Sequence, residues 1–310
     1  MRNKLSKKLQ KDLEKEVSDL EKSIDAEIKV SVYDIDSKLK AEVNGDKTGW
    51  AASIIKVPIL AVAGQEVSKG NLELKTNFRV NHKFTLEDSD FISRLLDGSE
   101  VNMFSLLYSM IVESDNEAAN IIVDNFGVNN VNNAFWKLGL NKTMLGHLLC
   151  PNVPRYTSNF NKDGSNITST NDMVKIMRHI YDGKFSKLDL GSRLLSNVVM
   201  SFTRPSFLNE GEFKKRNIKA KVGHLFDIKD GGDIHEVGII DKHLIVSIMM
   251  NKVGQNNGGN FGPYKTDNSL DHLLPNSSSF QEACSLEDLD SSSPFGAYKK
   301  IVNIIDKYVD

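Results

Sequence analysis

Three short patterns in the sequence carry side chains that could perform nucleophilic catalysis. Residues 53–56 read S-I-I-K, residues 114–116 read S-D-N, and residues 221–223 read K-V-G. A serine hydroxyl is a poor nucleophile at neutral pH until a base removes its proton, and a lysine among apolar residues can serve as that base. Lys56 follows Ser53 by about one helical turn, so we expect both side chains on one face. The sequence therefore predicts a serine nucleophile beside a lysine base.

The first two patterns also have simpler explanations, in which each serine only begins a helix. Ser53 could be an N-cap with Lys56 as a surface residue, because serine often caps helices. Ser114, with Glu117 three residues later, fits a capping box. Neither explanation accounts for all three patterns occurring in order along one chain.

The first and third patterns are common, so context has to select among their copies. S-x-x-K recurs at residues 37–40, and K-x-G recurs at Lys137, Lys162, Lys229 and Lys252. Lys221 stands on a predicted strand with two more strands after it, whereas Lys252 ends the last of these strands. Ser53 follows a predicted hairpin and opens a strongly apolar helix. We therefore select Ser53 and Lys221.

The elements that must position these residues follow from apolar periodicity. Helical spacing predicts an amphipathic helix over residues 4–24, with one stripe formed by Leu5, Leu9, Leu13, Val17, Leu20 and Ile24. Period-two alternation predicts a hairpin with strands over 28–34 and 38–43. The other predicted elements are helices over 53–67, 103–112, 116–124, 171–181 and 296–309, and strands over 218–222, 236–240 and 244–250.

The order of these elements predicts the fold class. Strands from both chain ends can complete one antiparallel sheet only if the helical block is inserted between them. The sequence thus predicts an α/β (α+β) protein with a single catalytic domain over 1–310. Its α/β part should span about 1–50 and 184–310, and its helical part about 51–183. Small-molecule sites often lie in a cleft where two such parts meet.

Two segments lack periodicity. Residues 141–169 collect Gly, Asn, Pro and Ser and predict a long loop, which in a compact domain is often functional. Residues 254–294 are rich in Asn, Gly and Ser and predict a loop insertion with little core of its own.

Composition excludes several classes of protein. The chain has 310 residues, and its Lys+Arg count of 39 nearly equals its Asp+Glu count of 41, so charge alone would not attract nucleic acid or an anionic membrane. No apolar run is long enough to cross a bilayer. Cys150 and Cys284 are too few for a disulfide framework or a four-ligand zinc site. We expect the partners to be small molecules or other proteins.

The sequence also predicts that the protein has no metal centre and that the chain is not exported. The histidines lack a metal-ligand spacing, and His235 beside Glu236 is expected on a sheet edge. The N-terminus is charged throughout and lacks the apolar core of a secretory signal, which predicts a cytoplasmic location, or a periplasmic or secreted one if a signal has been removed. Trp50 and Trp136 are expected to be packing residues.

The three motifs in this order resemble those of the penicillin-recognising serine hydrolases, and most closely those of the class A β-lactamases. The resemblance extends over almost the whole chain, from the first helix to the terminal strands and helix. It implies a β-lactamase/transpeptidase-like fold, in which an antiparallel sheet from both chain ends is flanked by terminal helices and an all-α subdomain is inserted. It implies a serine hydrolase that needs no cofactor.

The resemblance assigns catalytic roles to the first two motifs. Ser53 would be the acylated nucleophile, and Lys56 its general base or proton relay. Ser114 would pass a proton to the leaving nitrogen. The backbone N–H groups of Ser53 and His224 would form the oxyanion hole, in which removal of one donor typically costs roughly 3 kcal/mol of transition-state stabilisation.

The resemblance also implies a set of substrate-binding residues. Asn116 would bond the amide side chain of the substrate. Lys221 would offer positive charge to a substrate carboxylate and would help set the pKa of the Ser114 hydroxyl. Gly223 and His224, at the end of the third motif, complete the set.

Two departures from the family pattern bear on substrate and turnover. Val222 replaces a hydroxyl residue that helps hold the substrate carboxylate, and a lost hydrogen bond to a charged group costs about 1.5–3 kcal/mol. Class A enzymes use a loop glutamate to activate the deacylating water, but residues 148–158 contain no carboxylate. Asp163, the nearest acid, and Lys56 are the alternative water activators.

These departures leave several functions open. The leading hypothesis is a serine hydrolase that acylates Ser53 with an amide or ester substrate, a β-lactam among the candidates. The alternatives are a peptidase or esterase acting on a non-lactam substrate, and a penicillin-binding protein with slow deacylation. A further hypothesis, from another class, is a binding or regulatory protein that has kept the fold and lost turnover.

Overall fold

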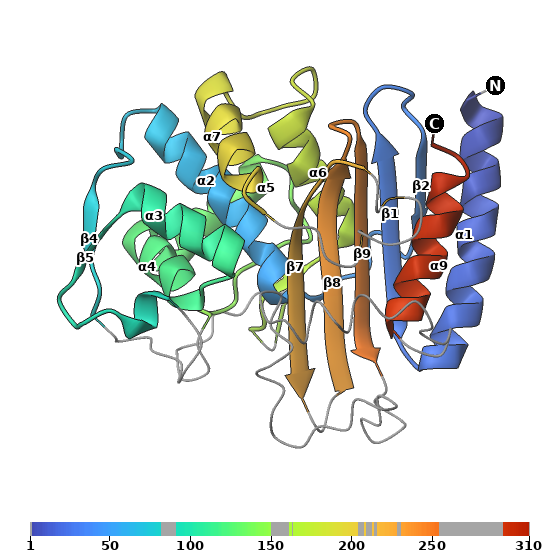
Figure 1. The fold of residues 1–310 in the computed structure, drawn as a ribbon, viewed down its shortest axis with the longest axis horizontal. Helices are drawn as coiled ribbons and strands as arrows, with labels where there is room; N and C mark the ends of the chain where they lie inside the picture. Colours follow the sequence, from blue (N-terminus) through green and yellow to red (C-terminus); the bar gives the residue numbers. More distant parts are fainter. Residues whose placement is uncertain are drawn as a thin grey trace. The chain divides into compact units, whose positions relative to one another are not determined.

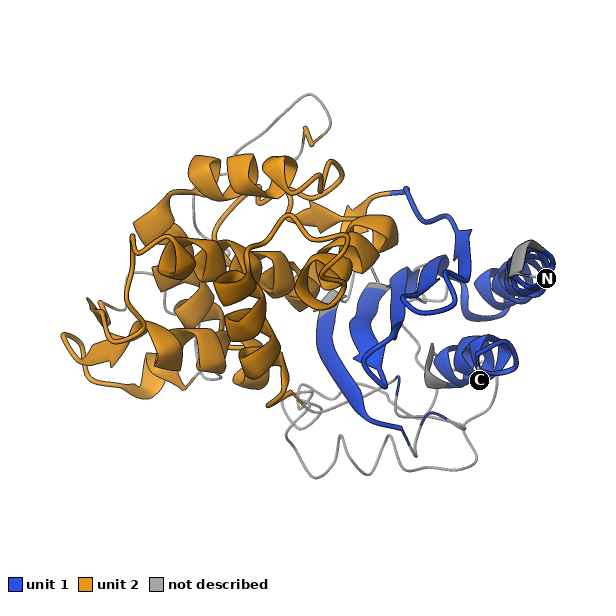
Figure 2. Ribbon diagram, turned by 90° about the horizontal axis from the view of Figure 1, so that it is seen from above, with its two compact units in different colours: residues 1–47, 205–310 blue, residues 48–204 orange. Residues whose placement is uncertain are grey.

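The computed structural model describes residues 2–81, 91–149, 161–162, 164–203, 208, 213, 216–227, 231–253 and 294–309. The chain forms two compact units (Figure 2). The first unit combines Met1–Lys47 with Pro205–Asp310, and the second unit is Thr48–Arg204. The second unit is thus inserted into the first, as the strands at both chain ends predicted. It also includes α7 (Leu190–Met200), which lies beyond the predicted end of the helical part at about residue 183.

The first unit is built on a five-stranded antiparallel sheet with the order β2-β1-β9-β8-β7 (Figure 1). The strands are β1 (Glu27–Asp34), β2 (Lys40–Val43), β7 (Ile218–Asp227), β8 (Gly231–Ile240) and β9 (Leu244–Val253). The predicted hairpin and the three late strands are confirmed. β8 begins five residues earlier than predicted, because Gly231 and Gly232 pair with the far end of β7.

The helices α1 (Arg2–Ile24) and α9 (Pro294–Asp306) lie side by side against one face of this sheet (Figure 1). Their apolar stripes pack with alternate strand residues in one core, to which belong Leu9, Leu13, Val17, Ile28, Val30, Val246, Ile248, Tyr298 and Ile301. The predicted terminal helices are therefore confirmed. Leu5 was expected in the buried stripe but is 41% exposed, one turn before the core begins.

The second unit is mainly helical. Its α-helices are α2 (Lys56–Ser68), α3 (Met103–Tyr108), α4 (Asn116–Phe126), α5 (Val128–Lys137), α6 (Thr170–Tyr181) and α7. Short 3-10 helices span Ala52–Ile55 and Ile92–Arg94, and a π-helix spans Ser109–Glu113. Two-stranded sheets pair β3 (Gly49–Trp50) with β6 (Ile167–Thr168) and β4 (Asn77–Arg79) with β5 (Glu100–Asn102).

The prediction missed two helices of this unit and merged two others. α5 contains four asparagines, which are poor helix formers, and its buried residues Val128, Val131 and Phe135 compensate through packing. α7 escaped notice because large apolar residues stand on its exposed side as well as its buried side. The helix predicted over 103–112 consists of α3 followed by the π-helix.

Other expectations concern segments that lie mostly outside the described residues. These include the 254–294 insertion, of which only Pro294 is described as the first residue of α9, and both cysteines. The described part of the 141–169 loop is irregular apart from β6 and a bridge between Met144 and Ile167. Among the helices that are described, none is both long and apolar enough to span a membrane.

Candidate active site

Ser53 stands in a tight turn at the start of the most buried helix of the second unit. Ala52, immediately before it, has a φ of 41°, in the left-handed region that is costly for a residue with a Cβ atom. The 3-10 helix that follows brings residues three apart into line, so Ser53 Oγ lies 3.0 Å from Lys56 Nζ. The capping alternative is wrong for Ser53, because neither the 3-10 helix nor α2 has a side-chain cap. Lys56 is fully buried.

Ser114 and Asp115 form a second strained turn, between the π-helix and α4. Ser114 has left-handed backbone angles, with φ 60° and ψ 26°. Asp115, and not Ser114, caps α4, since its carboxylate accepts from the N–H of Ala118 at 2.8 Å. The same buried carboxylate accepts from the N–H of Ile92 at 2.9 Å and from the hydroxyl of Ser109 at 3.2 Å. Asp115 therefore holds the turn that presents Ser114.

Lys56 connects the two turns. Its Nζ lies 2.6 Å from Asn116 Oδ1 and 3.3 Å from Ser114 Oγ, and it also bonds the backbone carbonyl of Ser114. A carbonyl oxygen can only accept, so Asn116 Oδ1 and the Ser114 carbonyl each take one N–H of Lys56. A neutral amine has two N–H groups and one lone pair. In the neutral form of Lys56, with both N–H groups directed at carbonyls, the lone pair can accept from the hydroxyl of Ser53 or of Ser114.

The structure thus brings together four predicted site residues: Ser53, Lys56, Ser114 and Asn116. Lys56 is the first residue of α2, and this helix is closely packed. Every residue of α2 from Lys56 to Gly64 is buried. A Cβ atom on Gly64 would lie 3.1 Å from the carbonyl oxygen of Ser192, so glycine allows α7 to approach closely.

Sequence reasoning missed three asparagines that hold the start of the long loop. Asn120 accepts from the backbone N–H of Leu149 at 2.6 Å and donates to its carbonyl at 3.2 Å. Asn132 makes the same pair of bonds to Leu145, at 2.8 and 2.9 Å. Asn166 Oδ1 accepts from the N–H groups of Gly146 and His147, at 2.9 and 3.1 Å. For Asn120 and Asn132, an asparagine at a buried position of a helix was the available signal.

The Asn120 bonds locate the loop relative to the site. Asn120 lies one turn after Asn116 on α4, so the two side chains share a face, and Asn116 bonds Lys56. The backbone of Leu149 is therefore held beside the face of α4 that also contacts Lys56. Of the segment 148–158, Leu148 and Leu149 are described; its other residues and Asp163 lie outside the described residues.

The predicted residues of the third motif lie on β7, in the first unit. Lys221 is 4% exposed, and its Nζ donates to the Val222 carbonyl at 2.7 Å. Val222 packs in the core beneath α1 and α9, so its side chain is on the face opposite Lys221. The units are described separately, and the placement of Lys221, Gly223 and His224 beside Ser53 stays a prediction.

Two expectations about other residues need correction. His235 is not on a sheet edge: β8 lies between β9 and β7, and the imidazole is fully buried. Trp50 and Trp136, expected to pack, are 37% and 39% exposed. Within the described ranges, no group of three or more His, Cys, Asp or Glu side chains could hold a metal ion.

Comparisons with known proteins identify the family and the fold. A model of the β-lactamase enzyme family matches residues 11–261. A search of curated proteins gives no match. Among solved structures, a β-lactamase from Xanthomonas campestris pv. campestris is similar with a TM-score of 0.71 at 16% identity, covering 97% of this chain and 99% of that chain. PBP-A is similar with a TM-score of 0.69 at 20% identity, covering 97% of this chain and 96% of that chain.

A β-lactamase from Sphaerobacter thermophilus is similar with a TM-score of 0.64 at 19% identity, covering 80% of this chain and 90% of that chain. At such identities these structures show the fold, which is the predicted β-lactamase/transpeptidase-like fold. The family match covers most of the chain and supports a serine hydrolase. The chain belongs to the β-lactamase enzyme family.

Proposed function

We propose that this member of the β-lactamase enzyme family is a serine hydrolase that forms an acyl-enzyme at Ser53, with β-lactams as its leading substrate class. The observation that carries the proposal is the Lys56 amine, buried and 3.0 Å from Ser53 Oγ, with both neighbouring carbonyls taking its N–H groups. That arrangement supports a lone pair directed at the nucleophile. A serine that only caps a helix and a lysine on the surface would not require this arrangement.

Acylation follows from the same contacts. Lys56 Nζ takes the proton of Ser53 as Oγ attacks the substrate carbonyl carbon, and the negative charge that develops on oxygen is held by backbone N–H groups, those of Ser53 and His224 in our proposal. The ring C–N bond then breaks. Ser114 gives its hydroxyl proton to the leaving nitrogen and recovers one from Lys56, 3.3 Å away. The proton thus moves from Ser53 through Lys56 and Ser114 to the substrate.

Deacylation is the slow step in this proposal. Hydrolysis of the ester needs a base that activates water, and the segment 148–158 supplies no carboxylate. Leu149, whose backbone Asn120 fixes near Lys56, has a side chain that cannot accept a proton. A PBP-A variant of similar fold has been solved as an acyl-enzyme complex with penicillin G, which supports the same covalent chemistry here.

The test is a time course of intact-protein mass spectrometry after mixing with penicillin G or a chromogenic cephalosporin. We expect an adduct that forms on the wild type and is still present after hours. Ser53→Ala should form none. Ser37→Ala is the matched control, because Ser37 begins the other S-x-x-K pattern, and it should behave as wild type.

Two results would change the proposal. Rapid hydrolysis with no lasting adduct would mean a working water activator and a β-lactamase. No adduct and no product would favour the peptidase or esterase alternative, for which Val222 and its place in the core provide support, because no hydroxyl there can bind the carboxylate of a β-lactam.

A further inference from the structure

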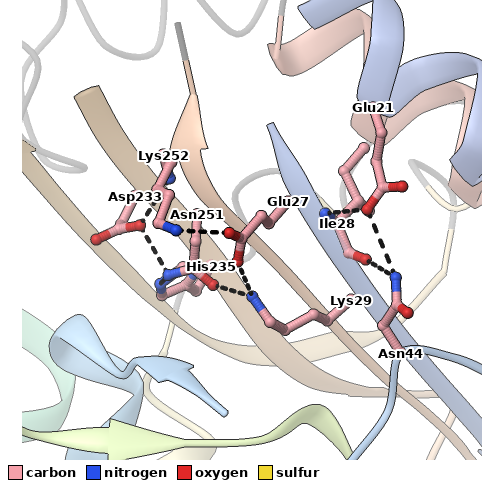
Figure 3. A network of polar contacts seen from close by, with 9 residues as sticks. All are labelled: Glu21, Glu27, Ile28, Lys29, Asn44, Asp233, His235, Asn251 and Lys252. Atoms are coloured by element: carbon pink, nitrogen blue, oxygen red, sulfur yellow. Dashed lines mark hydrogen bonds and ion pairs between the residues drawn. The ribbon is translucent and has the colours of Figure 1, made fainter. Parts of the chain in front are cut away.

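A second polar network lies in the first unit, on the sheet face opposite α1 and α9 (Figure 3). Its centre is Asn251 on β9, which contacts Lys29 of β1 and both Asp233 and His235 of β8. Lys29, Asp233, His235 and Asn251 are all at most 4% exposed. Such a set is costly to bury unless its hydrogen bonds are mutually consistent, so the protonation of each member constrains the next.

Lys29 and Asp233 together fix the amide of Asn251. Lys29 Nζ has donors only, and it lies 2.6 Å from Asn251 Oδ1. Asp233 Oδ1 accepts from Asn251 Nδ2 at 2.7 Å and from the backbone N–H of Lys252 at 3.2 Å. Turning the amide over would set an N–H₂ group against the ammonium and an oxygen against the carboxylate. The amide therefore has one favourable orientation.

This orientation determines which imidazole nitrogen of His235 carries the proton. Asn251 Nδ2 lies 3.4 Å from His235 Nε2, a long hydrogen bond in which the amide nitrogen is the donor. Nε2 must then accept, so it carries no proton. A neutral imidazole has its proton on the other nitrogen, Nδ1. A doubly protonated imidazole would place two donors against each other.

The position of His235 connects this chemistry to the predicted substrate-binding segment. His235 pairs directly with Gly223 on β7, and Val237, two residues later, pairs with Lys221. Paired residues of an antiparallel sheet point to the same face, so His235 and Lys221 are diagonal neighbours, roughly 7–8 Å apart by strand geometry. Lys221 is the residue from which we expect a positive charge for the substrate.

We propose that Lys29, Asp233 and Asn251 hold His235 as a neutral side chain with its proton on Nδ1, so that the position diagonal to Lys221 on the neighbouring strand does not carry a second cation. In its functional part this inference rests on the proposed function. Asn251 and Lys29 are positioning residues, because they act through His235. Within the described strands, the charged groups around the imidazole are Asp233 on β8, Glu27 and Lys29 on β1, Lys252 on β9 and Lys221 on β7.

The structural part is tested by long-range ¹H–¹⁵N NMR of the full chain labelled at histidine, with His235→Gln to assign the signal. We expect Nδ1 protonated, Nε2 unprotonated and His235 still uncharged near pH 6.5, where free histidine titrates. His179 is the internal control with the opposite tautomer. Its Nδ1 accepts from the N–H of Lys187 at 3.0 Å, so Nε2 donates to the Leu138 carbonyl, 2.8 Å away. A protonated Nε2 on wild-type His235 at pH 7 would overturn the proposal.

Lys29→Met tests the positioning role, because it removes the ammonium that bonds Asn251 Oδ1 and leaves only Asp233 to orient the amide. We expect the pKa of His235 to rise in this variant, and His179 to be unchanged. An unchanged His235 signal in a folded Lys29→Met protein would contradict the role of Lys29. Asn251→Leu, which removes the donor outright, should give the same rise and covers the case in which Lys29→Met fails to fold.

The functional part is tested by the pH dependence of acylation by a penicillin that carries a carboxylate. In the wild type, we expect no change that follows His235. In Lys29→Met, the rate should rise as pH falls through the new pKa, by between about 1.5- and 5-fold for one added charge at an ion pair. A flat profile in a variant whose NMR signal does titrate would overturn the functional part. If no penicillin acylates the protein, the NMR result still stands and the proposed function is what has failed.

Discussion

Each unit contains a buried lysine whose amine contacts the side-chain oxygen of an asparagine. We infer different roles for the two lysines. Lys56 Nζ lies 2.6 Å from Asn116 Oδ1, and Lys29 Nζ lies 2.6 Å from Asn251 Oδ1. Both side chains are at most 1% exposed. The other partners differ: Lys56 also contacts the hydroxyls of Ser53 and Ser114, whereas Lys29 lies 3.6 Å from the carboxylate of Glu27.

The difference teaches that burial alone does not make a lysine a base. A hydroxyl can exchange a proton with an amine, so Lys56 can pass a proton between two serines. The carboxylate of Glu27, which has no counterpart among the described contacts of Lys56, instead favours the charged ammonium of Lys29. Burial lowers the pKa of Lys29, and the charge of Glu27 opposes that shift. We therefore infer chemistry at Lys56 and positioning at Lys29.

The largest expected effect separates the two lysines directly. Lys56→Met should slow acylation by penicillin G by about 10²–10⁴-fold, the usual contribution of a general base. Lys29→Met should change the acylation rate by no more than about 5-fold. The measurement is the second-order acylation rate, followed by mass spectrometry. Equal losses in the two variants would break the comparison.

The next effect concerns the slow step. Leu149→Glu introduces a carboxylate on the loop that Asn120 holds near Lys56, and we expect hydrolysis of the acyl-enzyme to accelerate by about 10²-fold or more. Leu149→Gln is the matched control, because it has nearly the same size but cannot take a proton from water. Product release is measured with the chromogenic cephalosporin. If Glu and Gln behave alike, the missing base is not what limits turnover.

A smaller effect is expected on stability, at the turn that presents Ser114. Asp115→Ala removes the acceptor of three hydrogen bonds inside the second unit, which should lower the free energy of unfolding by about 2–3 kcal/mol. Chemical denaturation measures this loss. Acylation of the remaining folded protein should also slow, since Ser114 loses its support. A stability within about 0.5 kcal/mol of wild type would contradict the role of Asp115.

The smallest effect is a pH dependence in the first unit. Burial raises the pKa of Asp233 to about 6, although hydrogen bonds from Asn251 and Lys252 oppose the shift. An aspartate with a raised pKa binds more protons folded than unfolded, so its contribution to stability is present at low pH and is lost as pH rises from about 4 to 6. Asp233→Asn should remove this loss, and should gain roughly 1–2 kcal/mol on wild type between pH 4.5 and pH 7.5. Parallel stability curves for the two proteins would contradict it.

Much of the fold could be predicted from the sequence, because it depends on local periodicity. The stripe of α1, the alternation of β1 and β2, and the apolar run of α2 each reflect a face that must be buried. The Ser53 and Lys56 pair could be predicted for the same reason, since three residues of helix bring their side chains together.

The features that could not be predicted depend on pairing between distant segments. His235 was expected on a sheet edge because periodicity does not reveal strand order, and β7 covers that side of β8. The hydrogen bonds of Asn132, Asn166 and Asn120 to the long loop join residues that are 13, 20 and 29 positions apart, beyond the reach of local periodicity. The Asn251 network likewise requires the register of three strands.

The most direct test of the central claim is peptide mapping of the protein after it has reacted with penicillin G and been separated from free drug. We expect the penicilloyl group on the peptide that contains Ser53, on no other serine, and still present after hours. A persistent adduct on a different residue, or a folded protein that never acquires one, would contradict the account of Ser53 and Lys56 as nucleophile and base.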